Sequence, residues 1–455
     1  MSVALSERPA QTGTQTTGQL AALRARLESS DALASLCAVA DQALISGTSF
    51  VTAVVVGRCC GAETLGLYTL IVAAVAMTVG VADQLITAPY MMFHHRRRGR
   101  ALTAYQGSVL LHQLLMICVT AAVTAGVTAF VRSPETRLVG VILTLTLPGL
   151  LMRAYLREMA LAHNRIMELL LLDGWICGCQ LLTVSLMMLA GATNLTTLFA
   201  LTGSACLISV VLWWRTVRSR LRFCRRACRI HWQRNWRFGR WALATHLAGC
   251  STPYVMPWVL FALCGKAETG LLGSASVIVG VANILLSGLA DFLTPRAARA
   301  YATGGVIRLR SILRSMLAIS LLAIGSVCVI AVLFGQSIVD TLYDGRFSDV
   351  GTLISLLTFS VLANAVGNVA GNGLWALNLP RANFVADMLT LIVAIAAAPM
   401  MIRPWGATGA ALATLTACTC GAIVRQLIFQ QSARTQTASD TDRQTTTSAT
   451  DNGAC

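Results

Sequence analysis

Long runs of apolar residues recur along the whole chain and limit the folds that are open to it. Twelve of them can be traced, at 34–57, 66–92, 104–131, 138–158, 167–190, 194–214, 241–263, 270–293, 311–334, 351–375, 383–402 and 406–428. A helix of about 20 residues crosses a hydrocarbon core, and lipid offers no partners to a backbone that is not helical. With 56% hydrophobic and 12% charged residues, a water-soluble domain is excluded. We expect an all-α polytopic membrane protein with twelve transmembrane helices.

A duplication relates the two halves of the sequence. Segment 60–68 resembles segment 264–272, each with Cys-Gly at its start and Glu-Thr inside it. The matched residues lie between 205 and 214 positions apart: Glu63 and Glu268, Asp83 and Asp291, Asn164 and Asn378, and Asp173 and Asp387. The spacing grows slowly, as loop insertions would make it, and a period this long is not that of a solenoid. Six spans in each half predict two parallel six-helix bundles with a binding site between them.

The expected organisation has five parts. They are a cytoplasmic N-terminal tail (1–33), a first bundle (34–214), a basic cytoplasmic linker (215–240), a second bundle (241–428) and a C-terminal tail (429–455). Residues 1–17 are polar and hold no apolar segment of a signal peptide. The last tail is rich in Ser, Thr, Asp and Gln, so we expect it to be disordered.

The net charge of +16 is distributed unevenly along the chain. If both termini are cytoplasmic, 29 of the 35 Lys and Arg residues fall on the inner side, and the linker alone holds ten. This asymmetry follows the positive-inside rule and predicts that orientation. Arg interleaved with Trp in the linker is also typical of nucleic-acid binding. A segment that lies at the membrane interface on anionic lipids would have the same composition, and this interpretation also accounts for the membrane spans on either side of the linker. We therefore expect anionic membrane lipids and no nucleic acid as partners.

Several spans carry polar residues, which are costly in lipid. Arg153 and Arg157 lie one helical turn apart after Pro148-Gly149, where we expect a bend; they face a partner or water, or they reach the inner interface as snorkelling side chains. Asn364, Asn368 and Asn372 form a stripe on the tenth span, which is typical of helix packing or of a cavity wall. The seventh span holds His246, and Pro253 and Pro257 predict a kink in it.

Cofactors, metals and catalytic loops are not indicated. Cys224, Cys228 and His231 have the spacing of metal ligands, but Arg residues surround them and a fourth ligand is missing. No P-loop motif is present, and Lys266 is the only lysine. We find no loop large enough for a catalytic domain, so a carrier without cofactor is expected rather than an enzyme.

The chain resembles the polysaccharide flippases of the multidrug/oligosaccharidyl-lipid/polysaccharide (MOP) exporter superfamily. The resemblance rests on segments 47–50 (Gly-Thr-Ser-Phe), 61–68 and 406–413 and covers roughly residues 32–430. It implies two bundles that form a V around a central cavity. It also implies transport of an undecaprenyl-pyrophosphate-linked oligosaccharide from the inner to the outer leaflet of the bacterial inner membrane, with polysaccharide polymerase and export proteins as partners. The drug or cation antiporters of the superfamily are the alternative, followed by a membrane-embedded glycosyltransferase or polymerase.

Position and chemistry then suggest roles for residues within the spans. Arginines at the inner mouth would neutralise the pyrophosphate, because the guanidinium pairs with phosphate through two hydrogen bonds. The candidates are Arg153, Arg157 and Arg296, with Asn364, Asn368, Asn372, Gln42 and His246 as hydrogen-bonding partners for sugar hydroxyls. The aspartates near the inner span ends would pair with these arginines or take part in ion coupling: Asp41, Asp83, Asp173, Asp291 and Asp387.

Overall fold

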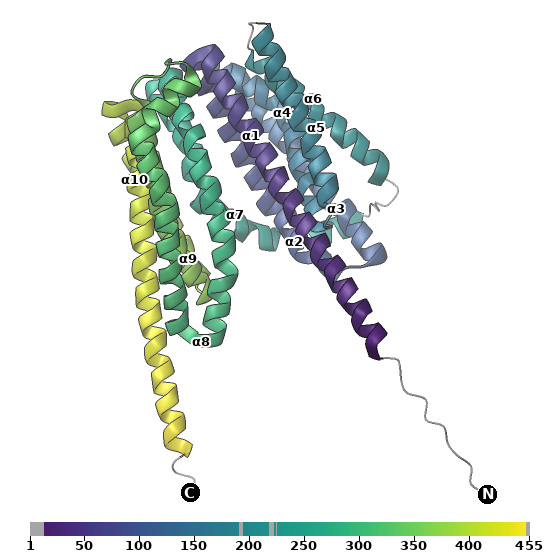
Figure 1. Cartoon of the computed structure of the whole chain (residues 1–455). Helices are drawn as coiled ribbons and strands as arrows, with labels where there is room; N and C mark the ends of the chain where they lie inside the picture. The colour runs from purple at the N-terminus through teal and green to yellow at the C-terminus, as the bar shows by residue number, and fades with distance from the viewer. Residues whose placement is uncertain (1–12, 191–193, 218–222, 224, 452–455) are drawn as a thin grey trace, which may run out of the picture.

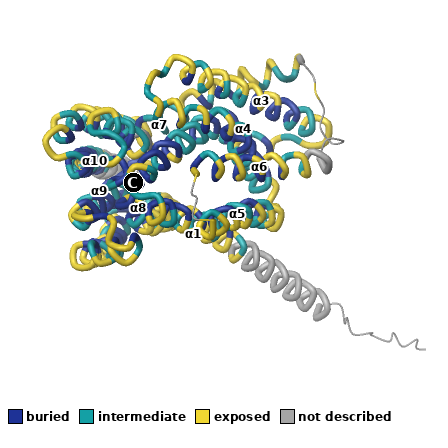
Figure 2. The backbone as a smooth tube through the Cα atoms, turned by 90° about the horizontal axis from the view of Figure 1, so that it is seen from above, coloured by how far each residue is buried: buried dark blue, intermediate teal, exposed yellow. Residues whose placement is uncertain are grey.

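The computed structural model describes residues 13–190, 194–217, 223 and 225–451, and all regular structure in these ranges is helical. The helices are α1 (Gly13–Ala82), α2 (Ala88–Phe93), α3 (Gly99–Phe130), α4 (Pro134–Ala162), α5 (Ile166–Leu189), α6 (Leu195–Val217), α7 (Arg225–Cys264), α8 (Lys266–Tyr343), α9 (Val350–Ala376) and α10 (Pro380–Asp451). A π-helical turn, η1 (Asp83–Thr87), and a 3-10 turn, η2 (His94–Arg96), flank α2. Helices α3 to α6 form one group and α8 to α10 another, with α1 and α7 between them (Figure 1; Figure 2).

Within the described residues, eight helices are long and apolar enough to cross a membrane, or nine if the bent helix α7 counts as one span. The chain is therefore a multi-pass membrane protein. Three of these segments greatly exceed the length of one crossing: Leu36–Arg96, from α1 to η2, has 61 residues, Lys266–Tyr343 of α8 has 78 and Pro380–Gln436 of α10 has 57.

Glycines interrupt each of these three long helices. Gly61 in α1 has φ 79° and ψ −176°, Gly304 and Gly305 break α8, and Gly406 in α10 has φ 52°. Glycine adopts positive φ without a steric penalty, which permits a sharp change of direction. Figure 1 shows the chain reversing direction within α8.

Helix α7 is bent by 55° between its two arms, 226–249 and 252–264. The bend coincides with Pro253, whose ring cannot fit against the carbonyl one turn earlier in a straight helix. The kink expected from the two prolines is thus confirmed. The first arm includes much of the expected linker 215–240, which is therefore helical over its described residues from Arg225 onward. That arm packs on α3, where the Tyr105 hydroxyl donates to Asn235 Oδ1 at 3.0 Å.

Three apolar clusters form the core. The largest combines both halves of the chain: Leu65, Tyr68 and Ile142 pack in the same cluster as Leu272 and Tyr343. The second contains only residues from 289 onward, and the third only residues from 85 to 213. The halves therefore share a core at one end, which we call the joined end. The start of α1 and the end of α10 lie at the opposite end, which we call the terminal end (Figure 1).

Two glycines allow α1 and α8 to cross closely at the joined end. A Cβ atom on Gly66 would overlap the carbonyl oxygen of Lys266, and one on Gly270 would overlap that of Ala62. Gly66 corresponds to Gly270, and Ala62 to Lys266, at a spacing of 204, so each helix presents the same pair of positions to the other. Small residues at a helix crossing let the backbones approach and maximise dispersion contacts.

The polar tails differ from expectation. Residues 13–33 continue α1, and residues 429–451, expected to be disordered, continue α10 as helix; residues 1–12 and 452–455 lie outside the described ranges. Extending an existing helix adds a hydrogen bond per residue without the cost of nucleation, which explains how a polar segment can continue a span.

Candidate functional site

The hairpin between α4 and α5 brings two arginines and an aspartate together. Asn164, in the left-handed conformation at φ 55°, ends α4 after Ala162, and α5 begins at Ile166. Arg157 lies five residues before the end of α4, and Asp173 lies seven residues after the start of α5. At 1.5 Å per residue, both are roughly 10 Å from the turn and therefore at the same depth. Helix α4 passes Pro148 without interruption, and Gly149 lets α6 approach closely there.

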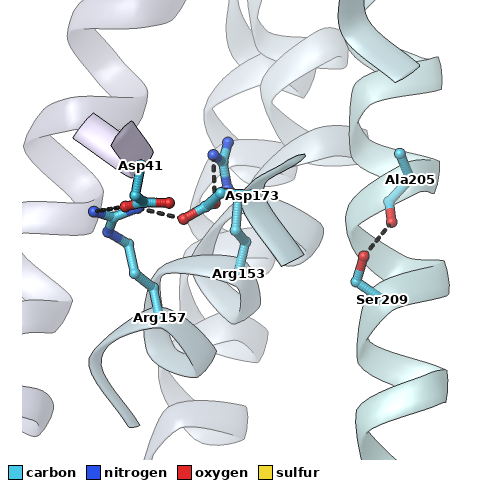
Figure 3. A network of polar contacts seen from close by, with 6 residues as sticks. All are labelled: Asp41, Arg153, Arg157, Asp173, Ala205 and Ser209. Atoms are coloured by element: carbon cyan, nitrogen blue, oxygen red, sulfur yellow. Dashed lines mark hydrogen bonds and ion pairs between the residues drawn. The ribbon is translucent and has the colours of Figure 1, made fainter. Parts of the chain in front are cut away.

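Asp173 is fully buried and is the centre of an ion-pair network (Figure 3). Its Oδ1 accepts hydrogen bonds from Nε and Nη2 of Arg153 at 2.9 and 2.7 Å, and its Oδ2 accepts one from Nη1 of Arg157. Burial and three charge-assisted hydrogen bonds hold this carboxylate firmly in place.

Asp41 on α1 completes the network. Its Oδ2 lies 2.7 Å from Nη2 of Arg157, so that this arginine bridges two carboxylates. Asp41 is 1% exposed, and its Oδ1 has no hydrogen-bond donor among the described residues. The hydrogen bond from Gln180 Nε2 to Thr52 Oγ1, at 3.0 Å, holds α5 against α1 nearby.

The four charges sum to zero, which explains how they are tolerated inside a membrane protein. A buried ion pair contributes little net stability, because desolvation offsets the Coulomb attraction, but loss of one partner typically costs about 3–5 kcal/mol. The arginines are the more exposed members, with side chains 17% and 23% accessible, against 0% and 1% for Asp173 and Asp41. Of the four side chains, only those of the two arginines are accessible to any appreciable extent.

A second buried pair lies in the other half of the chain. Asp387 on α10 forms an ion pair with Arg425, a residue that the sequence pattern did not single out. Asp387 lies seven residues after the start of α10 and follows Asn378, which has φ 60°, just as Asp173 follows Asn164. A charged residue inside the apolar run 406–428 was the available signal.

The space that Arg425 fills lies beside two glycines of α9. A Cβ on Gly367 would lie 3.0 Å from Arg425 Nη1, and one on Gly371 would lie 3.8 Å from Arg425 Cδ. The sequence offset that relates Asn164 to Asn378 pairs these glycines with Arg153 and Arg157. Both halves thus hold a buried Arg–Asp pair, but the arginine comes from α4 in one and from α10 in the other.

The asparagine stripe on α9 lies within a packed helix bundle. Asn372 is buried; its Oδ1 accepts from Thr294 Oγ1 at 2.7 Å, and its Nδ2 donates to the Asn368 carbonyl at 2.9 Å. Asn364 and Asn368 are half-buried. The sequence left two roles open for this stripe, helix packing and a cavity wall. The contacts of Asn372 match the packing role.

The remaining candidates whose side chains are described have contacts of their own. Gln42 is exposed and donates to Ser46 at 3.3 Å, and Asp83 is half-buried beside Thr87. Arg296 is exposed, with its guanidinium 3.4 Å above the Phe292 ring. His246 packs against Gly80 of α1, and its Nε2 has no hydrogen-bond partner among the described residues. The side chain of Asp291 lies outside the described part of the structure.

The Cys-and-His spacing in the linker is only partly described. Cys224 lies outside the described residues, while Cys228 Sγ contacts His112 Nε2 at 3.3 Å and His231 Nδ1 contacts Ser108 Oγ at 2.9 Å. The described residues contain no group of three or more His, Cys, Asp or Glu that could hold a metal ion.

Comparisons with known proteins identify the fold. No protein-family model and no curated protein matches the sequence. Among solved structures, an inward-facing multidrug resistance MATE transporter of the MOP superfamily superposes with a TM-score of 0.73 at 13% identity, over 87% of this chain and 95% of that one. The lipid II flippase MurJ, inward closed, gives 0.71 at 12% identity, over 88% and 87%.

An outward-facing MATE transporter of the same superfamily superposes less closely, with a TM-score of 0.58 at 14% identity, over 87% of this chain and 93% of that one. The higher score of the inward-facing structure agrees with halves that share a core at one end and have separate cores at the other. The chain therefore has the all-helical fold of the MOP-superfamily MATE and MurJ transporters, in an arrangement closer to the inward-facing one.

Proposed function

We propose that this chain is a transporter that moves a lipid-linked oligosaccharide, carried on undecaprenyl pyrophosphate, from the inner to the outer leaflet of the bacterial inner membrane. Its architecture in this proposal is twelve spans in two six-helix repeats, 34–214 and 241–428, with both termini in the cytoplasm. The glycine breaks in α1, α8 and α10 support the count, since each divides one long helix into two arms.

The observation that carries the proposal is the order of exposure in the ion-pair network. The Arg153 and Arg157 side chains are 17% and 23% accessible, whereas the Asp173 and Asp41 side chains are 0% and 1% accessible. A site built for a cationic drug would present carboxylates to its cargo. A pyrophosphate carries several negative charges, and arginine is suited to it because its planar fork donates paired hydrogen bonds.

In this proposal, Arg157 links cargo binding to ion coupling. It bridges Asp173 and Asp41, and the second oxygen of Asp41 lacks a donor among the described residues. Protonation of Asp41 would remove its charge and release the Arg157 guanidinium to the pyrophosphate. Loss of the cargo would return Arg157 to Asp41 and expel the proton. In this proposal, proton uptake and anion loading occur together at the terminal end.

The fold likeness to MurJ supports a lipid-linked cargo, because that protein is a lipid II flippase. The proposed partners are accordingly the lipid-linked oligosaccharide, anionic membrane lipids, and the polymerase and export proteins that would use the product. The activity requires no bond cleavage, so no enzymatic step is assigned.

A precursor-accessibility assay tests the proposal in cells. Cells that lack the transporter are expected to retain lipid-linked oligosaccharide on the cytoplasmic leaflet, and the wild-type chain to restore its exposure outside. If the chain restores no exposure although it reaches the membrane at normal levels, the proposed cargo is wrong.

A multidrug or cation antiporter is the second candidate, favoured by the donor-free oxygen of Asp41 among the described residues and by the fold likeness to MATE transporters. A carboxylate freed from Arg157 could hold a cation instead of a proton. Efflux of a fluorescent cationic dye separates the two functions: an antiporter lowers dye accumulation, whereas a flippase leaves it unchanged.

A further inference from the structure

A basic cavity of about 300 Å³ lies in the second half of the chain, and Gln426, which follows Arg425 of the second ion pair, is among its lining residues. The polar residues that line it are Arg310 and Arg314 from the second arm of α8 and Gln426, Gln430 and Arg434 from α10. Arg310 is five residues beyond the Gly305 break, which is roughly 8 Å along the helix. The cavity therefore lies near the terminal end of the bundle.

Three arginines meet in this cavity without carboxylate neutralisation. No Asp or Glu is among the described residues that line it, and none of Arg310, Arg314 and Arg434 forms an ion pair with a described side chain. Like charges that line one cavity repel each other unless an anion lies between them. The two glutamines add neutral donors beside the arginines, as a phosphate with several oxygens requires.

Apolar side chains form the rest of the cavity lining. Leu313, Val369, Ala370 and Phe429 line it, and all four belong to the core cluster of the second half. A free inorganic ion would gain nothing from these side chains. A molecule with an anionic head and a hydrocarbon body would contact both the basic and the apolar residues, so the lining favours an amphiphile.

The first half contains a corresponding cavity with different chemistry. It has a volume of about 160 Å³ and is lined by Tyr155 and Leu156. The offset that relates Asn164 to Asn378 places these two residues on Val369 and Ala370 of the basic cavity. Its arginine, Arg165, is 3.2 Å from Glu168 and is thereby neutralised. The same location in the two halves thus holds one neutral and one strongly basic cavity, and the helix arrangement alone does not produce the charge.

We propose that the cavity formed by Arg310, Arg314 and Arg434 binds the phosphate-bearing headgroup of an anionic phospholipid from the leaflet at the terminal end. The headgroup phosphate accepts from the guanidinium groups and from Gln426 or Gln430, and the acyl chains run along the apolar residues toward the membrane interior. Binding at this cavity does not depend on the identity of the transported cargo.

Binding of a fluorescent phosphatidylglycerol to the purified full-length chain in detergent tests this site. The variant Arg310→Gln/Arg314→Gln/Arg434→Gln is expected to lower affinity about tenfold or more, because each charge-assisted hydrogen bond is stronger than a neutral one. The matched control, Arg299→Gln/Arg308→Gln/Arg381→Gln, removes the same charge from three exposed positions outside the cavity and is expected to bind like the wild type. Equal affinities for the two triple variants would overturn the proposal.

Two further measurements use the unchanged protein. A photoactivatable phosphatidylglycerol is expected to cross-link to peptides that contain 310–317 or 426–434, and phosphatidylcholine carrying the same group is expected to do so much less. Cross-links confined to other segments, or equal yields from the two lipids, would contradict the proposal. Inorganic phosphate is expected not to displace the lipid at comparable concentration; if it does, the site serves a soluble anion instead.

Discussion

Arg425 lies against Gly367, with its Nη1 3.0 Å from where a Cβ of that glycine would be, and reaches Asp387 from there. In the first half, Arg153 and Asp173 are the counterparts of Gly367 and Asp387 at one common sequence offset, and Arg153 pairs with Asp173. The buried Arg–Asp pair is present in both halves although its arginine has changed helix. Glycine at 367 is what gives the relocated side chain its space.

This relationship predicts that the arginine can be moved back. Arg425→Ala leaves Asp387 buried without its partner and is expected to cost about 3–5 kcal/mol of stability. The double variant Gly367→Arg/Arg425→Ala should recover roughly half of that loss, because the new guanidinium starts where Arg153 does. Thermal unfolding of the purified protein in detergent measures both effects. A double variant less stable than Arg425→Ala would show that the two positions are not interchangeable.

A double-mutant cycle should show strong coupling between Arg153 and Asp173. Arg153→Ala leaves Asp173 with Arg157 alone, and Asp173→Ala leaves Arg153 without its carboxylate, so each single change is expected to lower stability, whereas the double change should cost clearly less than the sum. Additive losses in thermal unfolding would mean that the observed hydrogen bonds contribute no coupling.

The crossing of α1 and α8 makes the joined end sensitive to added volume. Gly66→Ala and Gly270→Ala each place a methyl group against a backbone carbonyl, which cannot move aside as a side chain can, so we expect about 1–3 kcal/mol of destabilisation. Gly47→Ala is the matched control, since no atom lies within 4 Å of its Cβ position in α1. Unfolding temperatures that fall equally for all three variants would argue against this contact.

The His163 contacts predict a pH dependence at the turn between α4 and α5. Its Nε2 lies 2.9 Å from both the Tyr90 hydroxyl and Gln106 Nε2. Burial lowers the His163 pKa below its usual value, and the nearby charges of His94, Arg165 and His95 lower it further. A histidine that titrates at a pKa of about 6.5 in the unfolded chain then binds more protons than the folded one, so its contribution to stability is complete above that pH and is lost as the pH falls below it.

His163→Gln should therefore reduce the loss of unfolding temperature between neutral and mildly acidic pH. His95→Gln is expected to have a smaller effect in the same direction, because His95 acts there only as a charge that lowers the His163 pKa. If His163→Gln retains the full pH dependence of the wild type, other groups are responsible for it.

The all-helical membrane fold could be predicted from the sequence because apolar run length and the restrictions of lipid determine it almost alone. Asn164 and Asn378, which the duplication matched, both have positive φ at equivalent helix ends. The exact alignment of segments 60–68 and 264–272 could not be predicted from the sequence. Gly61 and Gly265 share their unusual angles at a spacing of 204, so Glu63 and Glu268, 205 apart, are not equivalent positions. They also differ in contacts, since Glu63 pairs with Lys266 at 3.0 Å and Glu268 accepts from the Ala407 amide at 2.7 Å.

The candidate site was only partly accessible to sequence reasoning. The cost of a charge in lipid identified Arg153 and Asp173 as residues that need partners, and the structure joins them. Arg425 was missed because it lies near a span end, where snorkelling is the simpler explanation. A substitution on another helix that restores a lost charge leaves no local pattern, so only the three-dimensional arrangement reveals that Gly367 and Arg425 belong together.

Transport by the purified chain in proteoliposomes tests the central claim most directly. The assay measures how much undecaprenyl-pyrophosphate-linked oligosaccharide becomes accessible to an external glycosidase after a proton gradient is applied. We expect gradient-dependent translocation by the wild type, a partial reduction for Arg153→Lys, which keeps the charge but loses the planar fork, and a much larger reduction for Arg153→Ala at matched protein levels. Normal translocation by Arg153→Ala, or wild-type protein that moves a cationic dye and no lipid-linked sugar, would contradict the proposed function.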